Sequence, residues 1–268
     1  MTAIAVTIAG SDSSGGAGIQ ADLKTFAALG VYGASVIAAL TAQNTKGVTA
    51  IHDVPGDFIA AQIDAVFSDL DIGAVKIGML SQVAAIKAVA TALGRYRAKN
   101  IVLDPVIVAS SGATLLAGDA IEVLRHELIP RACVVTPNLA EAAALTGASP
   151  ARNEAEMEVQ ARQILALGAL NVLIKGGHGS GDESVDLLIG QGDVVRLSAK
   201  RIATKNTHGT GCTLSSAIAA GLAKGLDLAA AAHDAKAYVT SVIAAADQLE
   251  VGHGHGPLHH YYAQWRDE

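Results

Sequence analysis

The chain has 268 residues, of which 51% are hydrophobic, 16% are charged and 3% are aromatic. This hydrophobic fraction is enough for a large core, and the charged fraction is too low for a disordered or coiled-coil protein. The formal net charge of −6 argues against a protein that binds nucleic acid through its phosphates. The low aromatic content argues against a stacking platform for single strands.

The chain has only two cysteines, Cys133 and Cys212, and no Cys-x-x-Cys pair for zinc. It begins without the basic stretch of a secretory signal peptide. Residues 25–45 carry no charge, but the glycines and amides among them indicate a helix end, a turn and a buried strand rather than a membrane span. We therefore expect a cytoplasmic protein with no membrane contact.

Apolar runs alternate in kind along the chain, because short continuous runs predict buried strands and runs with helical spacing predict helices. The first half is expected to form a strand at Ile4–Ala9, a helix at Ala17–Leu29, a strand at Val36–Leu40, a helix at Asp57–Leu70, a strand at Ala74–Ile77, a helix at Gln82–Leu93 and a strand at Ile101–Leu103. The alternation continues through Ala120–Leu128, Cys133–Val135, Leu139–Leu145, Ala155–Leu167 and a strand at Leu170–Ile174. A hairpin of Val185–Ile189 and Val194–Leu197 follows, and then two Ala-rich helices from about Thr213 and Leu228.

This alternation predicts an α/β fold, with a mainly parallel sheet covered by helices on both faces. No linker or repeat divides the chain, so one domain over residues 1–268 is expected. A (β/α)₈ barrel has the same alternation. The expected hairpin interrupts the rhythm of a barrel and favours an open sheet.

A glycine-rich loop follows the first strand and contains Gly16-x-Gly18-x-x-Ala21, which matches the dinucleotide fingerprint. Six residues separate it from the strand, and no acidic residue follows the second strand to bind a ribose. A nicotinamide or flavin oxidoreductase is therefore a distant alternative. The sequence also lacks the Gly-x₄-Gly-Lys-Ser/Thr pattern of a P-loop.

A second glycine-rich segment, residues 206–213, leads into an Ala-rich helix. Gly209 and Gly211 allow successive N–H groups to point one way, and a helix N-terminus adds partial positive charge. This pattern predicts a nest for an anion or for negative charge in a transition state. Cys212 is expected at its mouth, where the helix terminus lowers a thiol's pKa. The alternative is a glycine-bracketed helix start with a buried cysteine.

Seven segments together resemble the hydroxymethylpyrimidine/phosphomethylpyrimidine kinases of thiamine biosynthesis, in the ribokinase-like superfamily. In chain order they are Ile8–Phe26, Ala42–Thr45, Lys76–Leu80, Asp104–Val106, Thr136–Glu141, Ile174–Gly177 and His208–Cys212. The resemblance extends over nearly the whole chain.

The resemblance implies a transferase that uses ATP and Mg²⁺ in two successive reactions. The first phosphorylates 4-amino-5-hydroxymethyl-2-methylpyrimidine, and the second converts that monophosphate to the diphosphate. It also implies a ribokinase-like three-layer α/β/α fold without a separate lid domain, and a homodimer.

The resemblance assigns the anion hole to Gly209, Thr210 and Gly211. It suggests Cys212 as the base that takes the proton of the substrate's hydroxymethyl group; the alternative is that Cys212 only packs on the substrate. Thr210 is expected to contact phosphate through its backbone or its hydroxyl. Lys175, at a strand end, and Lys236, in the last predicted helix, are the candidates for neutralising ATP phosphates.

Five residues are expected to bind the pyrimidine. Asp22 and Gln43 resemble the family's pyrimidine-reading residues, since a carboxylate and an amide pair with ring nitrogens and an exocyclic amine. Gly10 would bring the backbone close to the ligand. Met79 and Val106 are candidates to sandwich the ring, although core packing explains them equally well.

Asp104 follows a predicted strand, and Glu141 lies near a predicted helix start. Both are candidates to hold Mg²⁺ through water, because this ion needs few carboxylates beside its waters and phosphates. Either acid can instead cap a helix.

Two rival functions stay open. A pyridoxal or pyridoxine kinase shares this fold and the Gly-Thr-Gly-Cys pattern, and only the Gln43-Asn44 segment favours the pyrimidine kinases. A non-catalytic pyrimidine-binding regulatory protein is the other, and Lys175, Glu141 and Cys212 argue against it. The tail carries His253, His255, His259 and His260 in a spacing that matches no known zinc site.

Overall fold

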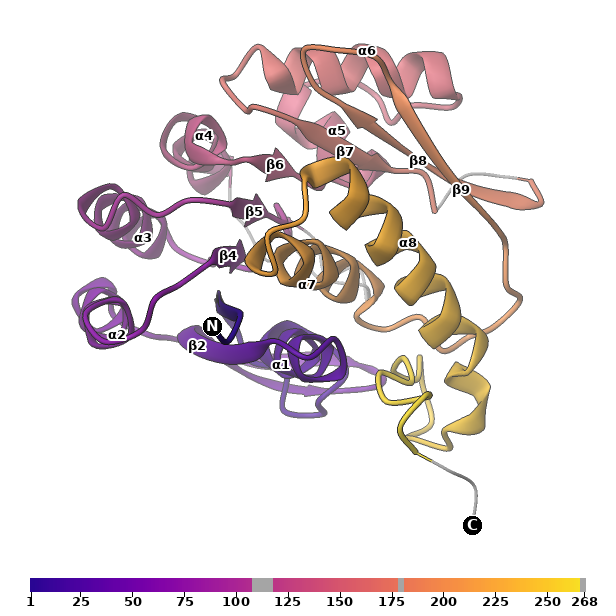
Figure 1. The fold of residues 1–268 in the computed structure, drawn as a ribbon, viewed down its shortest axis with the longest axis horizontal. Coiled ribbons are helices and arrows are strands. Elements are labelled where there is room, and N and C mark those ends of the chain that lie inside the picture. The colour runs from indigo at the N-terminus through magenta and orange to yellow at the C-terminus, as the bar shows by residue number, and fades with distance from the viewer. Residues whose placement is uncertain (108–117, 178–180, 266–268) are drawn as a thin grey trace.

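The computed structural model describes residues 1–107, 118–177 and 181–265. Within these residues nine strands form one sheet in the order β3-β2-β1-β4-β5-β6-β7-β8-β9 (Figure 1). The strands are β1 Ile4–Gly10, β2 Tyr32–Asn44, β3 Gly47–Asp53, β4 Ala74–Ile77, β5 Ile101–Leu103, β6 Val134–Val135, β7 Val172–Lys175, β8 Glu183–Ile189 and β9 Val195–Lys200. Neighbours from β2 to β7 pair in parallel, whereas β3 at one edge and β8 and β9 at the other pair antiparallel.

Helices cover both faces of this sheet. They are α1 Gly18–Ala28, α2 Gly56–Phe67, α3 Val83–Arg95, α4 Gly118–Glu127, α5 Leu139–Thr146, α6 Glu154–Leu165, α7 Thr210–Ala223 and α8 Leu228–Ala244, with short 3₁₀ turns at Ile129–Arg131 and Ala246–Gln248. The helices from α2 to α6 pack in one apolar cluster, and α1, α7 and α8 pack in the other. Figure 1 shows α2, α3 and α4 along one side and α7 and α8 across the other, so the molecule has three layers.

The central strands are apolar on both faces because each face meets helices. In β5, Ile101 and Leu103 join the cluster with α2 to α6, while Val102 joins the cluster with α1, α7 and α8. Successive side chains of a strand point to opposite faces, so a strand buried on both needs a continuous apolar run. The expected α/β fold with an open, mostly parallel sheet is therefore confirmed.

The strand β3 is the main departure from the expected elements. Its residues, Gly47–Asp53, are exposed or half-buried, so they form no apolar run to signal a strand. The edge strand β3 and the antiparallel pair β8–β9 leave the sheet open, which rules out the barrel alternative. The expected hairpin is confirmed, with Leu188 opposite Val195.

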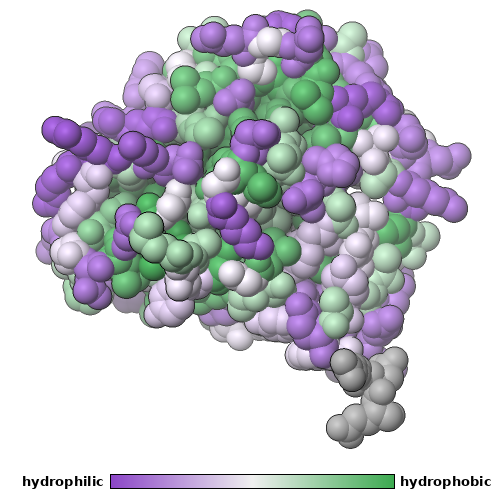
Figure 2. Space-filling model, in the orientation of Figure 1, coloured by the Kyte–Doolittle hydropathy of each residue, from purple (hydrophilic) through white to green (hydrophobic). Residues whose placement is uncertain are grey.

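The strand order places the carboxyl ends of β1, β4, β5 and β7 along one edge of the sheet, and the order reverses between β1 and β4. Ligands of open α/β sheets bind at such a reversal, outside the strands' carboxyl ends. Hydrophilic residues line much of the molecule's outline in Figure 2, with hydrophobic residues interspersed among them. Among the described residues, no helix is both long and apolar enough to cross a membrane.

Candidate active site

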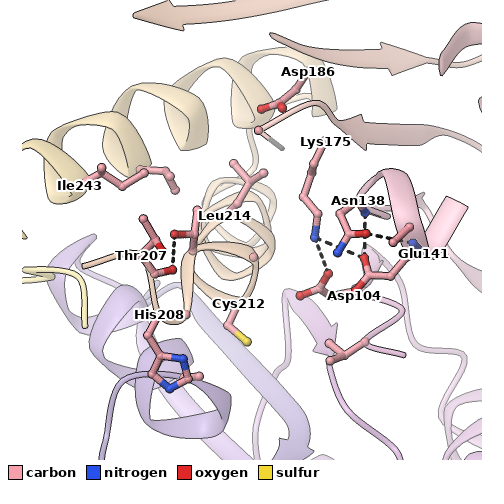
Figure 3. A pocket seen from close by; sticks show the side chains of 18 of the residues that line it. Asp104, Asn138, Glu141, Lys175, Asp186, Thr207, His208, Cys212, Leu214 and Ile243 are labelled. Carbon is pink, nitrogen blue, oxygen red and sulfur yellow. Dashed lines mark hydrogen bonds and ion pairs between the residues drawn. The ribbon is translucent and has the colours of Figure 1, made fainter. Parts of the chain in front are cut away.

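A cleft of about 910 Å³ lies at this carboxyl-end edge. It is lined by every residue that the sequence analysis placed in a site except Asp22. Those lining residues are Gly10, Gln43, Met79, Asp104, Val106, Glu141, Lys175, Gly209, Thr210, Gly211, Cys212 and Lys236. Segments far apart in the chain therefore meet around one cavity, and Figure 3 shows Cys212 on α7 across from Lys175 and Asp104.

The glycine turn that the sequence predicts before Cys212 is present at the start of α7. Gly209 is the N-cap residue and has φ of 86°, in the left-handed region that favours glycine. A Cβ here would also collide with the carbonyl oxygen of Gly16, so the absence of a side chain lets the two glycine loops touch. The first N–H groups of a helix have no partner within it. The N–H groups of Gly211 and Cys212, which line the cleft, are therefore without helical partners, as the predicted anion nest requires.

Thr210 has its hydroxyl already engaged, because Oγ1 donates to the carbonyl of Thr207 at 2.7 Å. This bond tightens the turn into α7. Of the two expected ways for Thr210 to contact a phosphate, the contact through its backbone is therefore the one that this geometry favours.

Cys212 departs from the expectation of a lowered pKa. Burial raises the pKa of its thiol to about 11. The ammonium of Lys76 and a hydrogen bond from the N–H of Gly18 oppose this effect without overcoming it. In the free protein the thiol therefore keeps its proton near neutral pH, because loss of hydration outweighs the charge of Lys76 and the hydrogen bond from Gly18.

Lys175, at the end of β7, reaches the start of α7, where its Nζ would lie 3.2 Å from a Cβ placed on Gly211. Its Nζ is 2.9 Å from Oδ1 of Asp104 and 3.8 Å from Oε2 of Glu141. Burial alone would favour the neutral amine, but the two carboxylates raise the pKa of Lys175 above its usual value. The same ammonium, with Lys76, lowers the pKa of the buried Asp104. A charged lysine and an ionised aspartate thus face the cleft together.

Glu141 occupies the third position of α5 and completes a capping box. Its carboxylate accepts from the N–H of Asn138 at 2.8 Å, and its own N–H donates to Oδ1 of Asn138 at 2.9 Å. Burial and the nearby Asp104 raise the pKa of Glu141 to about 7, although Lys175 opposes them. The residue therefore has both the capping role and a place in the cleft.

The donor set on this wall suits a magnesium ion that arrives with a nucleotide. In the described residues no group of three or more His, Cys, Asp or Glu side chains is arranged to hold a metal alone. Magnesium retains waters and shares phosphate oxygens, so it requires only one or two carboxylates. Asp104 and Glu141 supply two, and Lys175 balances one of their charges.

Gln43, near the end of β2, lies at the other end of the cleft. Its Oε1 accepts from Thr41 Oγ1 at 3.2 Å, and its Nε2 is 3.3 Å from Nε2 of His208. Met79 reaches across the cleft floor because Gly10 has no side chain, and a Cβ there would collide with the Met79 methyl group. With Val106, these residues make an apolar slot with an amide beside it.

Asp22 requires a correction, because it does not face the cleft. Its carboxylate is completely buried behind the wall and is bonded to Nζ of Lys76 at 2.8 and 2.9 Å. The hydroxyls of Thr7 and Ser216 donate to it at 2.6 and 2.7 Å. All its contacts are internal, so it offers nothing to a pyrimidine. Asp22 lies on the face of α1 that packs against the sheet, and the helical spacing in the sequence did not identify that face.

Lys76 itself was missed by the sequence analysis. The signal was present, since a lysine inside the apolar strand Ala74–Ile77 must be buried and therefore paired. The side chain is fully buried yet reaches the wall of the cleft. Removing one partner of such a buried pair costs about 3–5 kcal/mol, because the other charge is left uncompensated.

Asp12 and His208 were also missed as a pair. Oδ2 of Asp12 lies 2.8 Å from Nε2 of His208 and accepts from the N–H groups of Gly16 and Ala17 at 3.1 and 2.8 Å. Ser14 donates to Oδ1 from both its N–H and its hydroxyl. Although burial opposes it, these hydrogen bonds lower the pKa of Asp12 to about 2. One carboxylate therefore shapes the whole first glycine loop.

Lys236 reaches the cleft from α8. Its Nζ lies 2.8 Å from Oδ2 of Asp186 and 3.2 Å from Oγ of Ser184. Oδ1 of Asp186 accepts from the N–H of Gly176 at 3.0 Å. This pair joins α8 to the turn after β7, and it partly neutralises the ammonium that the sequence analysis assigned to phosphate.

The histidine-bearing tail packs against the cleft rather than extending from it. The N–H of Gly254 donates to Oγ1 of Thr45 at 3.1 Å, and the N–H of His208 donates to the carbonyl of Gly256 at 3.1 Å. His255 lines the cleft. The segment thus ties the turn between β2 and β3 to the start of α7.

The three-layer fold, the anion nest and a lysine among carboxylates define a ribokinase-like small-molecule kinase. A family model described as phosphomethylpyrimidine kinase matches residues 12–259. A hydroxymethylpyrimidine/phosphomethylpyrimidine kinase of Rhizobium meliloti is 61% identical over 267 residues, covering 100% of both chains. The Escherichia coli enzyme of that name is 53% identical, covering 97% of this chain and 98% of its own. The chain therefore belongs to the phosphomethylpyrimidine kinase family, as the resemblance implied.

Solved structures agree with this assignment. Phosphomethylpyrimidine kinase from Clostridium difficile is 47% identical with a TM-score of 0.79, over 90% of this chain and 99% of that one. The ADP complex of Bacillus subtilis pyridoxal kinase is 36% identical with a TM-score of 0.90, over 98% and 99%. The pyrimidine and pyridoxal kinases therefore share this fold, and the chain is more similar in sequence to the former.

Proposed function

We propose that this chain uses ATP to phosphorylate 4-amino-5-hydroxymethyl-2-methylpyrimidine and then phosphorylates the monophosphate to the diphosphate. The observation that carries the proposal is one cleft with the Gln43 amide and Met79 at one end, the Cys212 nest in the middle and Lys175 beyond it. Family membership and high identity to kinases of that name support it.

Each wall of the cleft has a part in the proposed transfer. Gln43 pairs with the polar edge of the pyrimidine, and Met79 and Val106 hold its faces. The N–H groups after Gly209 bind the transferring phosphoryl group, where charge neutralisation matters most. Lys175 and Lys236 neutralise nucleotide phosphates. Staphylococcus aureus pyridoxal kinase, with a TM-score of 0.90, has been solved with AMP-PCP, which supports ATP as the donor.

In the first reaction Cys212 acts as the base. Because the thiol of the free protein is protonated near neutral pH, its own proton must first leave to solvent. The proton of the hydroxymethyl group then moves to the thiolate sulfur, the alcohol oxygen bonds to the γ-phosphorus, and the bond to ADP breaks. In the second reaction the nucleophile is a phosphate oxygen, which is already ionised near neutral pH because its second pKa is about 6. That step needs no base.

Asp104 and Glu141 would hold the Mg²⁺ of the nucleotide through water. When bound, this ion would neutralise charge on the phosphates. The homodimer that the resemblance implies and the cytoplasmic location expected from the cysteine content belong to the same proposal, and native mass measurement tests the first of them.

A product assay tests the proposed function. Purified protein is given MgATP with the hydroxymethylpyrimidine, its monophosphate or pyridoxal, and the products are separated by chromatography. Turnover of both pyrimidines with pyridoxal far slower is the expected result. Preference for pyridoxal would make the chain a pyridoxal kinase and overturn the role of Gln43. Tight pyrimidine binding without turnover would support a regulatory protein.

A further inference from the structure

We propose that the buried pair of Lys76 and Asp22 controls the proton on Cys212, so that Lys76 acts through Cys212 as a positioning residue. The inference rests on the proposed function only for the role of Cys212 as a base. It gives a role to two buried charged residues that have none in the proposed phosphoryl transfer.

The sheet directs this pair toward α1 and α7. Ala74 packs in the cluster with those helices, and Lys76 is two residues further along β4, so it points to the same face. Ala5 and Thr7 stand in the same relation on β1. The ion pair with Asp22 of α1 therefore lies between the sheet and the two helices.

The contact to α7 places the pair beneath Cys212. Ser216 is four residues after Cys212, so the two side chains lie one helical turn apart on the same face. The hydroxyl of Ser216 donates to Oδ1 of Asp22 at 2.7 Å. Of the two charged partners, Lys76 reaches the cleft that Cys212 lines, and Asp22 does not.

The arrangement around Asp22 biases the pair toward a positive field at the cleft. The hydroxyl of Thr7 donates to Oδ2 of Asp22 and that of Ser216 donates to Oδ1, in addition to the ion pair with Lys76. These bonds disperse the negative charge of the Asp22 carboxylate. The ammonium of Lys76 is the member of the pair that lines the cleft, and a positive charge stabilises a thiolate in a low-dielectric site.

Four charged groups act on the sulfur from the elements packed around it. Lys76 of β4 and Lys175 of β7 favour the thiolate, while Asp22 of α1 and Asp104 after β5 oppose it. Lys76 is the largest of the influences that lower the pKa of Cys212, against the burial that raises it. Loss of Lys76 should therefore make the thiol harder to ionise.

The pH dependence of Cys212 alkylation tests this inference without any substrate. A Cys133→Ala background leaves Cys212 as the sole thiol. The double variant Lys76→Met with Asp22→Asn removes both charges and leaves no buried carboxylate unpaired. Iodoacetamide labelling is followed by mass at a series of pH values, because only the thiolate reacts. Lys87→Met, an exposed lysine on α3, is the matched control.

The midpoint of labelling should rise by about one pH unit in the double variant, so that labelling below the midpoint slows about tenfold. The control should not change it. First-step turnover should fall with the labelling rate, and second-step turnover should fall less. An unchanged midpoint in a variant that circular dichroism finds folded would overturn the inference.

Two further outcomes are separable. If the double variant does not fold, the variant Lys76→Gln with Asp22→Asn replaces it, because the amide introduced on β4 can still donate a hydrogen bond to the amide introduced on α1. The labelling midpoint should rise in this variant too, and an unchanged midpoint would again overturn the inference. A raised midpoint, in a protein that phosphorylates no pyrimidine, would support the electrostatic coupling while the proposed function fails. Pyrimidine turnover together with an unchanged labelling midpoint would refute only the electrostatic coupling between Lys76 and Cys212.

Discussion

Nε2 of His208 lies 2.8 Å from Oδ2 of Asp12, across a separation of 196 residues in the chain. Asp12 organises the glycine loop after β1, and His208 immediately precedes the N-cap of α7. Their contact therefore fixes the two loops that form the floor and the anion nest of the cleft. Gln43 lies against the same imidazole at 3.3 Å, so the pyrimidine end is joined to them.

Asp12→Asn should destabilise the protein by about 1–3 kcal/mol near neutral pH, because an amide nitrogen cannot accept the loop's N–H groups. The folded pKa of Asp12, about 2, is below its unfolded value. Its stabilisation is therefore present above about pH 4 and is lost as the pH falls toward 2. Urea unfolding should show the gap between wild type and variant shrinking in acid. The control Asp193→Asn, in the exposed turn between β8 and β9, should have the same free energy of unfolding as the wild type.

Cys212→Ala should slow phosphorylation of the alcohol by about 10²- to 10⁴-fold, the usual range for loss of a general base. Phosphorylation of the monophosphate should change far less, since its nucleophile is already ionised. The two steps are measured separately with each substrate in excess. Cys133→Ala is the control and should leave both rates intact. Equal losses in the two steps would refute the base assignment and leave Cys212 as a packing residue.

Gly209→Ala and Gly225→Ala form a matched pair, with φ of 86° and 88°. Each forces a side chain into the left-handed region and should cost about 1 kcal/mol. Only at Gly209 does the new Cβ meet the Gly16 carbonyl, whereas nothing lies within 4 Å at Gly225. Thermal unfolding and kcat/KM should show a larger loss of stability and a collapse of turnover for Gly209→Ala alone. Similar activity in both would argue against the nest.

Glu141→Gln should remove a pH dependence near neutrality. Because the folded pKa of Glu141 is raised to about 7, the wild type gains its charge only as the pH rises through 7. Apparent Mg²⁺ affinity should therefore weaken in the wild type as the pH falls through 7, and stay flat in the variant. If both respond alike, Glu141 does not act on the metal.

The same raised pKa affects stability. The stabilisation that the protonated Glu141 gives the folded protein is complete below its unfolded pKa of about 4.3 and is lost as the pH rises through 7. The Glu141→Gln variant should therefore become more stable relative to the wild type as the pH rises over that range. Glu156→Gln is the matched control. It removes an exposed carboxylate from the same third position of α6, where the Glu156 N–H donates to Oδ1 of Asn153 and the carboxylate accepts from the N–H of Arg152.

The sequence determined the layered fold because its signals are local. Continuous apolar runs such as Ile101–Leu103 require burial on both faces, and helical spacing between them requires covering helices. The glycines before Cys212 determined the turn into α7, because only glycine adopts the φ of 86° at Gly209 with little strain. The order of seven motifs indicated the family. The edge strand β3 was missed, because an exposed edge needs no apolar pattern.

The tertiary structure alone decided which charges meet. Asp22 and Cys212 look equally available in the sequence, yet packing of α1 on the sheet turns Asp22 inward to Lys76 and closes it off from the cleft. Burial likewise reversed the expected pKa of Cys212, because desolvation depends on every neighbouring element and not on the local helix start. Pairings such as Asp12 with His208 depend on the course of the whole chain, which no local pattern records.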